Sequence, residues 1–179
     1  MAKGASFSGH ERNRVFLQRR VDGRVDYVDV SAVSGLDSLG DGRAFAWLDF
    51  DHDGLRDVVV TNANEPRVQL FRNQMRPPRA VMALRLVGDH LGGKPSNADA
   101  IGARVEVDLA GRTRVMELRA GEGLAAQNSA ELLIGLGAAT SVDAIRVVWP
   151  GGGRTVLKQP KVVSGGRATL VVHEAAPER

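Results

Sequence analysis

The segment "AFAWLDFDHDGLRDVVV" (Ala44–Val60) places an acidic loop between two apolar stretches. The flanking residues are alternating or β-branched apolar side chains, a pattern typical of strands. The loop, "DFDHDGLRD", holds four aspartates within nine residues. Because like charges at this density repel one another, a folded chain that holds them together needs something that offsets the repulsion.

The spacing of these aspartates predicts a metal site. They occupy positions 1, 3, 5 and 9 of a D-x-D-x-D-G-x-x-D pattern, in which alternate side chains converge on one point. Gly54 permits the sharp turn at position 6, and position 7 offers a backbone oxygen. The predicted ligands are Asp49, Asp51, Asp53, the carbonyl of Leu55, and Asp57.

An all-oxygen ligand set favours Ca²⁺, whereas Mg²⁺ demands stricter geometry and keeps more of its waters. An EF-hand would have a glutamate at position 12, where this chain has Val60. Both flanks are β rather than helical, so the pattern indicates a calcium loop that joins two strands. The alternative interpretation is an acidic, solvated β-turn. His52 lies between two ligand positions and is expected to point outward.

Period-2 alternation continues along most of the chain, and Gly, Asp, Asn or Pro punctuate nearly every gap. The pattern predicts an all-β protein. The predicted strands are Arg14–Gln18, Arg24–Val30, Arg43–Phe50, Asp57–Thr61, Arg67–Arg72, Val81–Val87, Ala103–Leu109, Arg112–Arg119, Leu132–Ile134, Ala144–Pro150, Thr155–Leu157 and Ala168–His173.

One stretch, "RAGEGLAAQNS", is a long polar connection with two interpretations. Its side chains Arg119, Glu122, Gln127 and Asn128 are suited to a sugar or a peptide. In the second interpretation, which we favour, Asn128 and Ser129 satisfy backbone groups of the connection itself. The neighbouring "LAAQNSAELL" has a helical length, but its Asn-Ser centre indicates a loop with one irregular turn.

Composition narrows the classes of partner. The chain has 179 residues, with 43% hydrophobic and 25% charged, an ordinary globular balance. Only eight residues are aromatic, and the basic residues form no block, so nucleic acid is not an expected partner. The absence of cysteine excludes disulfides and thiolate metal sites. No apolar run approaches the roughly 20 residues that span a bilayer.

A weak internal repeat suggests a propeller-like blade. "NRVFLQR" (Asn13–Arg19) is echoed by "PRVQLFRN" (Pro66–Asn73), a period of the order found in propeller blades. The prolines of "NQMRPPRA" cannot continue a central strand, which predicts a boundary between a first region, 1–76, and a second, 77–179. Residues 1–14 lack the apolar core of a signal peptide, so either the protein is cytoplasmic or this chain has lost its leader.

With these motifs the chain resembles the C-terminal part of the cartilage-acidic-protein family, from about residue 7 to 174. Members of that family combine FG-GAP/VCBS-type propeller repeats with an ASPIC/UnbV domain. Besides the acidic loop, the motifs that carry the resemblance are "NADAIGARV" (Asn97–Val105), "AGEGLAAQNS" (Ala120–Ser129) and "VVWPGG" (Val147–Gly152). Ala98 and Gly152 depart from the usual Arg and Ser.

The resemblance implies a Ca²⁺ ion bound in a partial propeller-like blade, followed by a β-sandwich-like ASPIC/UnbV domain from about Val81. It also implies a secreted or envelope-associated protein with an adhesion or scaffolding role. A closed propeller needs several blades. We therefore expect the partial blade to pack against the second domain, to dock to further blades, or to form a homo-oligomer.

The leading hypothesis is a non-enzymatic calcium-binding β module that interacts with a protein or a glycan. No G-x-S-x-G elbow or phosphate-binding loop marks a catalytic centre. The four histidines lie far apart in the sequence, without metal-ligand spacing. The rival hypothesis is an accessory or catalytic protein of carbohydrate or natural-product (enediyne-type) metabolism, and a deep pocket with paired carboxylates would favour it. A third is a lectin-like sugar binder.

Overall fold

The computed structural model describes residues 11–75, 80–90, 96–137, 139, 141–161 and 166–174. It is mostly β, with 48% of residues in strands and 3% in helix. The elements are β1 (Phe16–Val21), β2 (Arg24–Asp29), α1 (Ser31–Ser34), β3 (Gly42–Leu48), β4 (Asp57–Asn62), β5 (Val68–Phe71), β6 (Ala80–Val87), β7 (Arg104–Leu109), β8 (Arg112–Glu117), β9 (Leu132–Gly137), β10 (Ala144–Val148), β11 (Arg154–Lys158) and β12 (Arg167–His173).

Each predicted strand is present, which confirms the all-β class. The largest shift is in β1, predicted over Arg14–Gln18 but running to Val21. The arginines at its end hide the strand from a hydropathy pattern, yet Arg19 pairs with Asp26 across the hairpin. The predicted boundary between residues 76 and 77 lies outside the described residues, as does His10.

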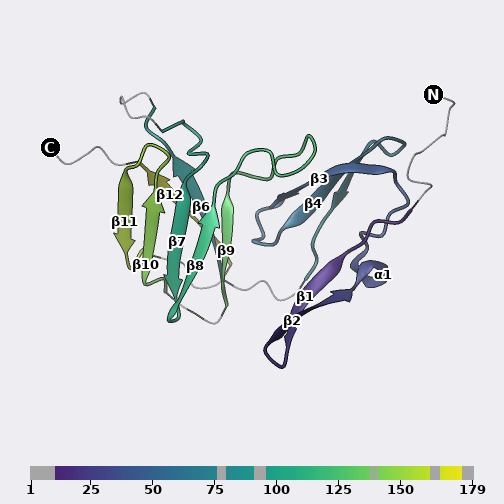
Figure 1. Ribbon diagram of the computed structural model, residues 1–179, viewed down its shortest axis with the longest axis horizontal. Helices are drawn as coiled ribbons and strands as arrows, with labels where there is room; N and C mark the ends of the chain where they lie inside the picture. Colours follow the sequence, from purple (N-terminus) through teal and green to yellow (C-terminus); the bar gives the residue numbers. More distant parts are fainter. Residues whose placement is uncertain are drawn as a thin grey trace.

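The chain from β6 onward forms two sheets around one core (Figure 1). Strands β11, β10, β7 and β8 make a four-stranded antiparallel sheet, and β12, β6 and β9 make a three-stranded one. Every fully buried member of the core cluster lies between Met82 and Val172. Both sheets contribute to this cluster, so this part is sandwich-like, as predicted.

The alternation of apolar and polar residues in the sequence determines which side chains enter this core. On β7, Val105 and Val107 are fully buried, while Arg104 on the same strand is exposed. Ile145 and Val147 of β10 stand opposite Val107 and Val105, and are also buried. Period-2 burial of branched apolar side chains from paired strands is what makes this sheet face adhere to its neighbour.

The last strand of the chain returns to the first strand of the sandwich. β12 lies parallel to β6, with Arg167 opposite Val81 and His173 opposite Val87. The β6–β9 pair on the other side is antiparallel. This closure places Arg167, which is distant in sequence from residues 11–75, at the end of β6 nearest to them.

Strands β1 to β5 form two small antiparallel sheets and not a closed propeller within the described residues (Figure 1). One is the β1–β2 hairpin, and the other is β3–β4–β5. Their only buried hydrophobic residues among those described are Val58 and Val60, each 7% exposed, and neither belongs to the core cluster. The first part of the chain therefore has far less core than the second.

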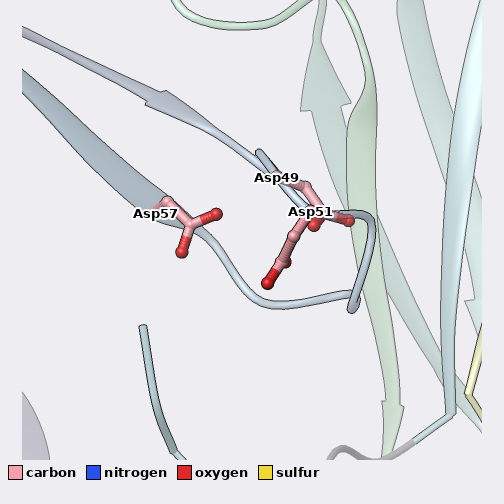
Figure 2. Close-up of side chains that lie close together, drawn as sticks. All are labelled: Asp49, Asp51 and Asp57. Carbon is pink, nitrogen blue, oxygen red and sulfur yellow. The ribbon is translucent and has the colours of Figure 1, made fainter. Parts of the chain in front are cut away.

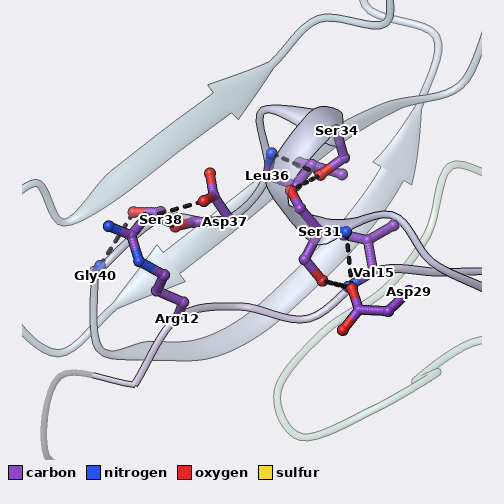
Figure 3. Close-up of polar contacts among 9 residues, drawn as sticks. All are labelled: Arg12, Val15, Asp29, Ser31, Ser34, Leu36, Asp37, Ser38 and Gly40. Carbon is purple, nitrogen blue, oxygen red and sulfur yellow. Dashed lines mark hydrogen bonds and ion pairs between the residues drawn. The ribbon is translucent and has the colours of Figure 1, made fainter.

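A network of serine and aspartate hydrogen bonds shapes the connection from β2 to β3 (Figure 3). Asp29 Oδ1 accepts from the amide and the hydroxyl of Ser31, and Ser31 Oγ in turn accepts from Val15 N at 2.8 Å. Ser34 Oγ donates to the Ser31 carbonyl. Gly35, in the left-handed region at φ 73°, ends the one-turn helix α1. Sequence patterns missed this helix because one turn has no periodicity.

The two parts of the chain touch through β3. Trp47 N donates to Asn128 Oδ1 at 2.8 Å, and the Trp47 carbonyl accepts from Ser129 N at 2.9 Å. The polar connection 120–131 thus pairs with the free edge of β3. Ser129 Oγ accepts from Glu131 N within the connection, as we favoured, whereas Asn128 satisfies a backbone amide of β3 instead. Among the described residues, no helix has the length and apolarity needed to cross a membrane.

Candidate metal centre

The acidic loop is a tight connection between β3 and β4. The strands close at the pair Leu48–Asp57, and the eight residues between them form the loop. Gly54 has φ +88°, and a Cβ at this position would stand 3.2 Å from Val81 of β6. Glycine is therefore required twice, for the left-handed backbone and for the close approach of the sandwich. His52 is exposed, as expected.

Three of the predicted ligands come together in the fold. Asp49, Asp51 and Asp57 each offer a carboxylate oxygen, and these atoms all lie within 4.8 Å of one another. Asp49 and Asp57 are buried and Asp51 is exposed, so the group has an inner and an outer side. Figure 2 shows Asp57 at the start of β4 and the other two on the loop that precedes it.

Asp57 is held entirely by the backbone. Its Oδ2 accepts from Phe50 N at 2.8 Å and its Oδ1 accepts from Asn73 N at 2.7 Å. Asp57 is fully buried, at 0% exposure. Each carboxylate oxygen has a further lone pair, so this side chain can still ligate a cation while it ties the loop to the segment after β5.

Asp49 links the loop to the second part of the chain. Its side chain is only 1% exposed, and its Oδ2 lies 2.8 Å from Arg167 Nε and accepts from Gly54 N at 3.1 Å. Arg167 also pairs with Glu131 at 2.5 Å. The other oxygen, Asp49 Oδ1, is buried without a hydrogen-bond partner. Arg167 Nε is also buried without one, because its ion pair with Asp49 Oδ2 lacks hydrogen-bond geometry. A buried carboxylate oxygen without a partner is costly, and a cation would satisfy it.

The outer side of the loop is neutralised by an arginine. Arg72 Nε lies 2.5 Å from Asp51 Oδ2, and Arg72 Nη2 lies 3.7 Å from Asp53 Oδ2. Asp53 does not belong to the three-carboxylate group; its Oδ1 accepts from Leu55 N at 2.8 Å, an Asx-type turn. The roles of Asp53 and of the Leu55 carbonyl as ligands therefore stay predictions.

These donors fit a hard divalent cation. The four aspartates and Glu131 carry five formal negative charges, and Arg72 and Arg167 supply only two positive ones, so the group keeps a net negative charge that an ion would neutralise. All the side-chain donors are carboxylate oxygens, the ligands that Ca²⁺ and Mg²⁺ prefer.

An open cleft of about 380 Å³ lies beside the loop, between β3 and the second part of the chain. The charged side chains that line it include Glu117, Arg119 and Glu122. The hydrogen bond and charge of Glu117 raise the pKa of the Arg119 guanidinium. Glu122 accepts from Asn128. Glu117 and Arg119 are thus paired with one another, and Glu122 is paired with the neutral side chain of Asn128.

Sequence analysis did not identify Arg72 and Arg167 as partners of the loop. Arg72 follows β5 directly, and only the sheet order β3–β4–β5 brings it beside the loop. Arg167 approaches because β12 lies parallel to β6, a non-local pairing that no short pattern encodes. The predicted carboxylates, in contrast, are adjacent in sequence, so their spacing alone revealed them.

Comparison with protein families identifies the second part of the chain. The family model described as ASPIC and UnbV matches residues 93–178. This region contains an ASPIC/UnbV domain, which confirms that part of the resemblance. No curated protein matches the chain. The acidic loop lies outside the matched residues, so its assignment to an FG-GAP/VCBS-type repeat stays a prediction.

Proposed function

We propose that the protein is a calcium-binding β module in which a Ca²⁺ ion holds the β3–β4 loop against the ASPIC/UnbV domain. The observation that carries this proposal is the group of Asp49, Asp51 and Asp57 oxygens, together with the unpartnered buried Oδ1 of Asp49. The aspartate spacing favours Ca²⁺ over Mg²⁺, because a flexible site with many oxygen ligands suits the larger ion.

The physical effect of the ion is to relieve repulsion where the two parts of the chain meet. Asp49 lies between the loop and Arg167, and Gly54 lies against Val81, so the loop is itself part of that contact. An ion that binds only the folded state stabilises it by about 2.7 kcal/mol at one hundred times its dissociation constant. The ion thus strengthens the fold and the contact together.

A thermal-shift experiment tests this function. We expect EDTA to lower the melting temperature and added Ca²⁺ to restore it, and we expect Asp51→Ala with Asp53→Ala to abolish the difference. The matched control is Asp26→Ala with Asp37→Ala, which removes two half-exposed aspartates paired with Arg19 and Arg12 elsewhere. A calcium response that survives in the loop double variant and equals that of the control variant would rule out the site.

The module's partner, in this proposal, is a protein, and its setting is the cell exterior or envelope. Phe45 and Trp47 stack edge to face on β3 with centroids 5.8 Å apart, and both remain well exposed. They border an apolar cleft of about 440 Å³ above Val58 and Val60. Exposed apolar patches of this kind mark interaction surfaces. A glycan array with and without calcium distinguishes the lectin-like alternative, which requires calcium-dependent glycan signals.

A further inference from the structure

The four aspartates of the loop divide into a buried pair and a solvent-accessible pair. Asp49 and Asp57 are buried, and backbone amides hold their carboxylates in place. The side chains of Asp51 and Asp53 are 26% and 27% exposed, so they remain accessible to solvent. A cation from solution therefore meets the solvent-accessible pair first.

Arg72 already occupies the position in front of that pair. Its guanidinium contacts Asp51 Oδ2 at 2.5 Å and reaches Asp53 Oδ2 at 3.7 Å, and its side chain is 55% exposed. The backbone beside it is anchored, because Asn73 N donates to Asp57 and Asn73 Nδ2 donates to the Arg56 carbonyl. Only the Arg72 side chain, and not the adjoining strand β5, needs to move for the site to become free.

A guanidinium and a divalent ion compete for these oxygens. Asp51 Oδ2 is in direct contact with Arg72, and the positive charge of Arg72 repels an ion that enters beside it. Arg167 is different: it is only 11% exposed and contacts Asp49 Oδ2, which leaves Oδ1 available. The two arginines thus have separate roles, one structural and one replaceable.

We propose that Arg72 is an internal counter-ion of the acidic loop, which keeps the ion-free loop folded and which a divalent cation displaces on binding. This inference rests on the proposed calcium function. It assigns Arg72 a regulatory role: the side chain lowers the calcium affinity of the loop and reduces how much the fold depends on the ion.

The test compares Arg72→Gln with the intact protein by calorimetric calcium titration and by melting temperature in EDTA. We expect the dissociation constant for Ca²⁺ to fall about tenfold, since a repulsive unit charge about 6 Å from a divalent ion is removed in water-like surroundings. The melting temperature in EDTA should fall, whereas the value in saturating calcium should barely change. Arg72→Lys, which keeps the charge, should stay near the dissociation constant of the intact protein.

The matched control is Arg67→Gln. Arg67 precedes β5, is similarly exposed, and pairs with Glu65 rather than with the loop. This variant should leave the dissociation constant for Ca²⁺ and the melting temperature in EDTA unchanged. If the intact protein binds calcium and Arg72→Gln binds it with the same dissociation constant, the counter-ion role is wrong and the calcium site stands. If neither protein binds calcium, the proposed function and this inference both fail.

Discussion

At the scale of single residues, Asp57 shows how one side chain serves both structure and ligation. Its two oxygens accept amide hydrogens from Phe50 on one side of the loop and from Asn73 beyond β5 on the other. Hydrogen bonds from neutral donors to a charged acceptor are stronger than neutral pairs. Asp57 therefore ties the loop to the segment after β5 through the backbone while its remaining lone pairs stay available for ligation.

Asp57→Asn should destabilise the protein by about 2 kcal/mol even in EDTA, because one amide N–H₂ must face a buried backbone N–H. Chemical denaturation with urea measures this change. Asp53→Asn is the control, since its Oδ1 can still accept from Leu55 N and the side chain is partly exposed. An equal loss of stability in both variants would contradict this role of Asp57.

The pH dependence of stability contains a contribution from an ion pair on the sandwich surface. Hydrogen bonds from Arg146, then from Thr113, lower the pKa of Asp108 from 3.8 to about 2. A carboxyl whose folded pKa is depressed adds stability above its unfolded pKa, and that stability disappears as the pH falls through the folded value. We expect Asp108→Asn to reduce the loss of stability between about pH 4 and 2, as followed by urea denaturation at each pH. Arg146→Gln should reduce it as well, and no change in either variant would contradict the pairing.

At the scale of elements, the strands followed from local pattern and the irregular segments did not. The alternation of apolar and polar residues predicted β7 and β10, because each of these strands has one buried face. The helix α1 depends on Ser31 and its contact with Val15, which lies before β1. Such side-chain-to-backbone bonds join segments that are separate in sequence, so a reading of local propensity cannot detect them.

The turn at Gly54 is the point where the loop element meets the sandwich. Gly54→Ala should lower stability by more than Gly23→Ala, the control in the β1–β2 turn. Both have positive φ, at +88° and +76°, and each alanine costs about 1–2 kcal/mol of backbone strain. Only the Gly54 variant also presses on Val81, whereas nothing lies within 4 Å of a Cβ at Gly23. Thermal unfolding measures the stability of both variants, and equal losses of stability would show that the loop does not pack closely against β6.

At the scale of the whole molecule, the core and the candidate site lie in different parts of the chain. The fully buried cluster belongs to the strands from β6 onward, and the acidic loop belongs to β3 and β4. The sequence predicted a boundary near Pro77 and Pro78, which lie outside the described residues, so that boundary stays a prediction. The sequence could not predict the Asp49–Arg167–Glu131 link, because that link depends on the parallel return of β12.

This division should appear in hydrogen exchange. We expect the amides of β3, β4 and β5 to exchange faster than those of β6, β7 and β10, because little apolar burial supports them. Added calcium should slow exchange in β3 and β4 in particular. Mass spectrometry of peptic fragments measures this pattern, and uniform protection that calcium does not alter would contradict it.

The central claim is that a divalent cation binds among Asp49, Asp51 and Asp57. Anomalous diffraction from crystals grown in saturating calcium tests it most directly. We expect one strong peak about 2.3–2.6 Å from carboxylate oxygens of these residues, with Arg72 turned away from Asp51. No peak at the loop, with the Arg72–Asp51 pair intact, would contradict the claim.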